Sequence, residues 1–91
     1  MARLIPVCGH AKHVRPQNPP RFSLAELQEF VRTNAPVSFI EKVPGFRMGD
    51  MCMLCHEEGL IYDLPINESA SILARQPILG NVLLISNHEW N

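Results

Sequence analysis

The pattern of apolar and polar positions predicts strands at both ends of the chain and in its middle. Residues 37–43 alternate between apolar and polar side chains, which is typical of a strand with one more deeply buried face. Residues 82–85 are four apolar side chains in a row, as in a strand buried on both faces in the middle of a sheet. Residues 4–8 form another apolar run, and we expect an edge strand there because Pro6 cannot donate a ladder hydrogen bond.

A tight hairpin is the centre of the predicted fold. Residues 51–56 should form a strand in which Met51, Met53 and Cys55 share one face. A turn at residues 57–59 follows, because its glycine permits the positive φ that a tight hairpin needs. We therefore expect residues 60–64 to pair back as the second strand of this hairpin.

Two helices are predicted from capping signals and apolar periodicity. Ser23 followed three residues later by Glu26 is a capping box, and apolar side chains recur at helical spacing after it. This helix should end before Pro36, which disfavours helical geometry at the preceding residue. Asn67 is expected to cap a second helix that ends near Arg75.

The predicted order of elements is β-α-β-β-β-α-β, which indicates an α+β fold. The economical arrangement is one small, mostly antiparallel sheet of four or five strands with two helices on one face. Ninety-one residues fit a single domain, with a basic, proline-rich strand or arm at residues 1–21 and an α+β core at residues 22–87. Only 19% of the residues are charged, so apolar surface needs cover, and this favours a homo-oligomer.

Charge is distributed unevenly although the net charge is only −1. Residues 1–21 carry four basic side chains and no acidic one, so this arm either contacts an anion or, as is commoner, is solvated. The low net charge makes nucleic acid a less favoured partner. The candidate ligand-binding residues are three arginines and the start of the second helix, where backbone amides are free: Arg15, Arg21, Arg47, Asn67 and Glu68.

The compartment is expected to be the cytoplasm. The chain has three cysteines, an odd number, and its first residues do not resemble a signal peptide, which together favour a reducing environment. No apolar run approaches the roughly 18 residues that a membrane span requires, so we expect no membrane partner.

The first expectation is that the protein has no cofactor, and zinc is the alternative that the cysteine and histidine residues suggest. Residues three apart on a strand point to opposite faces, so the paired cysteines of the predicted strand are better explained as small buried hydrophobes. A zinc site would take three thiolates and one imidazole, from Cys8, Cys52, Cys55 and one of His10, His13 or His56.

Catalytic motifs do not emerge from the sequence. The run Cys52-Met-Leu-Cys55-His56 has the spacing of a c-type haem attachment, but that chemistry requires export from the cytosol. The sequence has no glycine-rich phosphate loop, nucleophile elbow or HExxH motif. We therefore expect a protein that is not an enzyme.

Four stretches carry a family resemblance: residues 23–31, residues 38–41, the turn at 57–59 with residues 64–67, and residues 78–84. They resemble a small family found in bacteriophages and other mobile elements, the domain of unknown function numbered three-eight-four-six. The likeness does not include the N-terminal stretch. The chain departs from the family at three places: residues 32–35 replace paired glycines, His56 replaces an asparagine, and Asn81 replaces a common aspartate.

The resemblance implies a phage-type accessory protein that acts by binding in the cytoplasm of a host bacterium. The first hypothesis is a non-enzymatic inhibitor that antagonises a host process such as anti-phage defence. It would block a host protein or sequester a small anionic ligand such as a signalling nucleotide. Two alternatives stay open, namely a zinc-stapled protein-interaction module and a small nucleic-acid-binding protein that uses the basic N-terminal arm.

Overall fold

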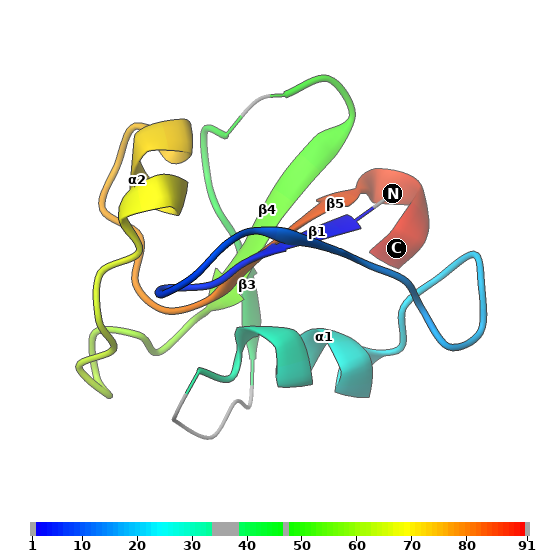
Figure 1. The fold of residues 1–91 in the computed structure, drawn as a ribbon, viewed down its shortest axis with the longest axis horizontal. Helices are drawn as coiled ribbons and strands as arrows, with labels where there is room; N and C mark the ends of the chain where they lie inside the picture. The colour runs from blue at the N-terminus through cyan, green and yellow to red at the C-terminus, as the bar shows by residue number, and fades with distance from the viewer. Residues whose placement is uncertain (1, 34–38, 47, 91) are drawn as a thin grey trace.

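One antiparallel sheet of five strands organises the computed structural model, which describes residues 2–33, 39–46 and 48–90 (Figure 1). The strands are β1 (Ala2–Ile5), β2 (Lys12–Val14), β3 (Ile40–Lys42), β4 (Met51–His56) and β5 (Val82–Ser86). Their order across the sheet is β2-β1-β5-β4-β3, and every neighbouring pair is antiparallel. The helices are α1 (Leu24–Val31), α2 (Glu68–Ala74) and α3 (Asn87–Trp90).

The α+β class with a small antiparallel sheet is confirmed, but α1 and α2 lie on opposite faces of the sheet (Figure 1). Leu27 of α1 packs in one core cluster with Leu54, whereas Ala70 of α2 packs in a second cluster with Met53. Adjacent residues of β4 point to opposite faces, so these two clusters are separated by the sheet. The prediction of two helices on one face is therefore wrong, because a strand buried on both faces needs cover on both.

The predicted hairpin over residues 51–64 is also wrong. The two edges of β4 are occupied by β3 and β5, which leaves no place for residues 60–64 in the ladder. Those residues form turns closed by local hydrogen bonds. The amide of Tyr62 donates to the carbonyl of Glu58 at 3.1 Å, and the amide of Leu64 donates to the carbonyl of Gly59 at 2.9 Å. The backbone is thus satisfied without a strand partner.

The first strand lies inside the sheet and not at its edge. β1 pairs with β2 on one side and with β5 on the other. It ends at Ile5, so Pro6 falls just outside the ladder and its missing N–H removes no strand hydrogen bond. The predicted strand over residues 37–43 is described from residue 39 onward, and β3 occupies its centre; residues 37 and 38 lie outside the described residues.

Both predicted helix starts are confirmed. The Ser23 hydroxyl accepts from the Glu26 amide at 3.2 Å, and the Glu26 carboxylate accepts from the Ser23 amide at 2.9 Å, which completes the capping box of α1. Asn67 caps α2 through its side-chain oxygen, and Arg75 ends the helix in a left-handed conformation. Among the described residues, no helix has the length and apolar character needed to cross a membrane.

Candidate functional site

The arginines predicted to bind a ligand do not gather at one place. Arg15 follows β2 and lines a hollow with His13 and Glu89. Arg21 is exposed in the connector before α1. Arg47 lies outside the described residues. Of the two predicted arginines that the structure describes, Arg15 thus lies beside a concave surface that Glu89 shares.

Asn67, a predicted ligand-binding residue, has a structural role in the fold. Its side chain is fully buried, and its oxygen accepts from the Ala70 amide at 3.0 Å. Its nitrogen donates to the carbonyls of Ile5 at 2.9 Å and Gly80 at 3.0 Å. These three bonds join β1, α2 and the segment before β5, so the amide is fully used within the fold. Glu68 is exposed in the first turn of α2.

The predicted zinc ligands are not brought together. Cys52 belongs to the core cluster on the α1 face of the sheet, and Cys55 belongs to the cluster on the α2 face. Cys8 and His10 are exposed in the connection between β1 and β2. Across residues 2–33, 39–46 and 48–90, no group of three histidine, cysteine, aspartate or glutamate side chains converges as metal ligands do.

The two buried thiols are held in their protonated form. Burial raises the pKa of Cys52 above its ordinary value. Burial together with the carboxylate of Glu41, whose oxygen lies 3.9 Å from the sulfur, raises the pKa of Cys55 to about 12. A thiol must lose its proton to act as a nucleophile, so neither cysteine is activated at neutral pH.

His56 organises the turn that follows β4. Its side chain is buried, and its Nδ1 accepts a hydrogen bond from the Glu58 amide at 3.0 Å. Its ring also lies against that of Tyr62, with the ring centroids 5.6 Å apart. The imidazole thereby holds the loop between β4 and α2 in a compact shape, and it is engaged in packing the turn.

An exposed apolar surface, which the sequence did not reveal, lies on this loop and on α2. We call it the α2 surface and define it by six large side chains: Leu60, Ile61, Tyr62, Ile66, Ile72 and Leu73. Leu60 is 85% exposed and Ile72 is 77% exposed. All six come from residues 60–73, which form the turns after β4 and the helix α2 on one side of the molecule (Figure 1). The apolar run that suggested a strand is the signal that could have located it.

Acidic side chains accompany the α2 surface. Between residues 57 and 75 the chain carries four acidic side chains and one basic one. Three of the acids are exposed and the fourth is half-buried. The acidic residues are Glu57, Glu58, Asp63 and Glu68, and the basic residue is Arg75. The surface therefore combines apolar contact area with a negative surround.

A second concave region lies at the opposite end of the sheet, on the face that α2 only partly covers. We call it the sheet-face hollow; its volume is about 450 Å³. Its walls come from β1, β2, the start of β4 and the end of β5. They include Arg3, His13, Met48, Asp50, Met51 and Leu84.

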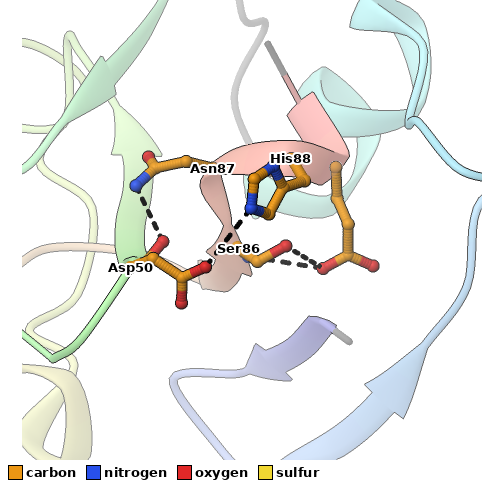
Figure 2. A network of polar contacts seen from close by, with 5 residues as sticks. Asp50, Ser86, Asn87 and His88 are labelled. Atoms are coloured by element: carbon orange, nitrogen blue, oxygen red, sulfur yellow. Dashed lines mark hydrogen bonds and ion pairs between the residues drawn. The ribbon is translucent and has the colours of Figure 1, made fainter.

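Polar contacts fix one wall of the sheet-face hollow (Figure 2). Asn87 donates to the Asp50 carbonyl from its side chain at 2.7 Å and from its backbone at 3.0 Å. The imidazole of His88 lies 3.6 Å from the Asp50 carboxylate. Ser86 donates to the Glu89 carboxylate from its hydroxyl at 3.0 Å and from its backbone at 3.3 Å. The contacts of Asn87 and His88 attach α3 to the loop that precedes β4, and those of Ser86 join the end of β5 to α3.

Hydrogen bonds, including those from Ser86, favour the charged form of Glu89. Partial burial alone would raise the pKa of this carboxyl, but the hydrogen bonds that it accepts, among them those from Ser86, lower the pKa below its ordinary value. An ionised Glu89 therefore closes the turn between β5 and α3 at neutral pH.

Comparison of the chain with family models, with curated proteins and with solved structures gives no match. The resemblance to the phage family stays a prediction from the residues that carry it.

Proposed function

We propose that this protein is a non-enzymatic binding protein that blocks a partner protein by covering it with the α2 surface. The observation that carries the proposal is the exposure of six large apolar side chains within residues 60–73. Exposed apolar side chains that gather on one part of a small domain are typical of interaction surfaces. Full burial of one leucine or isoleucine is worth about 1.5–3 kcal/mol, so a few of them give substantial affinity.

The acidic surround defines the chemistry of the partner. Four acidic side chains flank the apolar ones, so the complementary surface is apolar at its centre and basic at its rim. A second copy of this chain fits less well, because a two-fold contact brings the same acidic residues face to face. A homo-oligomer, which the low charged fraction predicts, would then use a different surface.

The biological setting of the proposal comes from the phage-family resemblance. It makes the partner a host protein in the bacterial cytoplasm, and blocking an anti-phage defence component is the proposed consequence. The raised pKa of both buried cysteines supports a binding role over a nucleophilic one. A turnover assay in which catalytic amounts of the protein consume a nucleotide would contradict this proposal.

A matched pair of surface variants tests the proposed contact. Ile72→Ser removes an exposed apolar side chain from α2, and Leu24→Ser removes one from α1 on the other face of the sheet. The wild type should capture a partner protein from a host extract. We expect Ile72→Ser to weaken the affinity for that partner about tenfold, the equivalent of about 1.4 kcal/mol, and Leu24→Ser to leave it unchanged. Equal capture by both variants would place the contact elsewhere.

A further inference from the structure

The sheet-face hollow exists because α2 covers only one end of its face. Ala70 of α2 packs over the half of the sheet that contains Ile5 and Val82. The other half of the sheet ends where Met51 of β4 pairs with Ser86 of β5. The described helices that pack on this half lie on the opposite face of the sheet. An open sheet face with an apolar floor remains there.

One wall of the hollow is cationic. Arg3 of β1 pairs directly with His13 of β2 and with Leu84 of β5. Directly opposite residues of antiparallel strands project their side chains to the same face, about 4.5–5.5 Å apart at Cβ. Neither side chain forms an ion pair or hydrogen bond with another described residue. Arg3 and His13 therefore present polar groups to the hollow that no other described residue uses.

Thioether and aliphatic groups form the floor. Met51 donates its backbone N–H to the carbonyl of Met48 at 3.0 Å, so a tight turn holds the two methionine side chains near one another. Leu84 lies beside them in the middle of the sheet. Methionine adapts its shape to a ligand and makes favourable contacts between its sulfur and aromatic rings. This floor suits a flat ring better than a small hydrated ion.

The wall opposite Arg3 and His13 carries an acceptor. The backbone of Asp50 is held by Asn87, and its carboxylate lies near His88 (Figure 2). This carboxylate is 65% exposed, so it can still accept a hydrogen bond from a ligand. The hollow thus offers donors on one side, a flat apolar floor, and an acceptor on the other side.

We propose that the sheet-face hollow binds a small anion with a flat heteroaromatic body, the chemistry of a nucleoside monophosphate. The anionic group would lie against Arg3 and His13, the ring on the methionines, and a ring amine against Asp50. A volume of about 450 Å³ suits such a molecule. The inference does not rest on the proposed protein partner, because the α2 surface lies at the other end of the sheet.

The test uses adenosine monophosphate as the probe and the methionine methyl groups as reporters. In full-length protein labelled with carbon-13 at these methyls, the probe should shift the signals of Met48 and Met51, which line the hollow. Met53 is fully buried beneath the α2 side of the sheet and should shift less. Adenosine and inorganic phosphate, each tested alone, should bind about tenfold more weakly, since each uses only one side of the hollow.

Two arginine variants distinguish this site from general attraction of an anion to the basic arm. Arg3→Gln should weaken binding of the probe about tenfold, because it removes a charge-assisted contact. Arg21→Gln removes the same charge from an exposed position outside the hollow and should leave the affinity within about twofold. In the absence of the probe, a Met53 methyl signal at its wild-type position shows that a variant is folded.

Three results would overturn the inference. They are the absence of shifts at Met48 and Met51 at millimolar probe, equal losses with Arg3→Gln and Arg21→Gln, and binding of inorganic phosphate as tight as that of the nucleotide. None of them concerns the α2 surface, since Ile72→Ser leaves the residues of the hollow unaltered. Failure of this site and failure of the proposed protein contact are therefore distinguishable.

Discussion

Asn67 is the side chain at which three segments of this small fold meet. Its amide caps α2 and donates to the carbonyls of Ile5 and Gly80. A buried carbonyl that loses its donor costs about 1–3 kcal/mol, and a lost helix cap costs about 0.5–2 kcal/mol. The sequence predicted the cap from residue type, but the two carbonyl contacts depend on distant parts of the chain and could not be predicted from it.

We expect Asn67→Ala to lower the free energy of unfolding by about 2–4 kcal/mol, since it removes the cap and leaves two carbonyls without their donor. That is a large part of the stability of a 91-residue domain. Urea unfolding followed by the fluorescence of Trp90 measures the change. Asn18→Ala, at an exposed position, is the control and should change the stability by less than about 0.5 kcal/mol. Equal effects of the two variants would refute the bridging role.

The elements were predictable where a local signal determines them. The capping box of α1 and the continuous apolar run of β5 are complete within a few residues, and both elements form where expected. Residues 60–64 carry the apolar character of a strand, yet Leu60 and Ile61 remain exposed because β4 already has two strand partners. That outcome depends on pairing between strands that are distant in the sequence, and the composition of a segment does not specify such pairing.

The capping box of α1 should make stability depend on pH. Hydrogen bonds from the backbone of Ser23 and then of Gln17 lower the pKa of Glu26 in the folded state. A carboxyl whose pKa is lowered by folding stabilises the protein at pH values above the pKa that this carboxyl has in the unfolded chain. This contribution is lost as the pH falls through the pKa of the folded state. The loss should therefore occur as the pH falls below the ordinary glutamate pKa of about 4.3.

Thermal unfolding of the wild type and Glu26→Gln measures this contribution. The wild type should be the more stable of the two at pH 7, and the difference should shrink as the pH falls through the folded pKa of Glu26, because its carboxyl then becomes neutral like the glutamine side chain. Glu29→Gln on the same helix is the control, because Glu29 is exposed and its contact with Arg32 is a surface pair at 3.7 Å. A difference between wild type and Glu26→Gln that is constant with pH would contradict the role of the charge.

At the scale of the whole molecule, the two candidate surfaces follow from how the sheet is covered. Both core clusters are needed because β4 and β5 are apolar on both faces, so α1 and α2 occupy opposite sides. α2 is short, and it leaves half of its face open as the sheet-face hollow. The residues of that hollow come from four separate segments, so the register of the strands, which the sequence alone does not specify, was needed to find it.

The division of the two strand cysteines between opposite cores predicts how the three thiols of the intact protein react. Cys8 is exposed, whereas Cys52 and Cys55 are buried and their pKa values are raised, so only Cys8 should react rapidly with a thiol reagent at pH 7.5. The two slow thiols should react together, because global unfolding of the sheet exposes both. The labelling rates of the two slow thiols should rise together as the urea concentration increases, and Cys8→Ser should abolish only the fast phase.

Mass spectrometry of the labelled protein counts the modified thiols over time. Rapid labelling of Cys55 alone would show that its face of the sheet opens locally, and the shared rate would then be wrong.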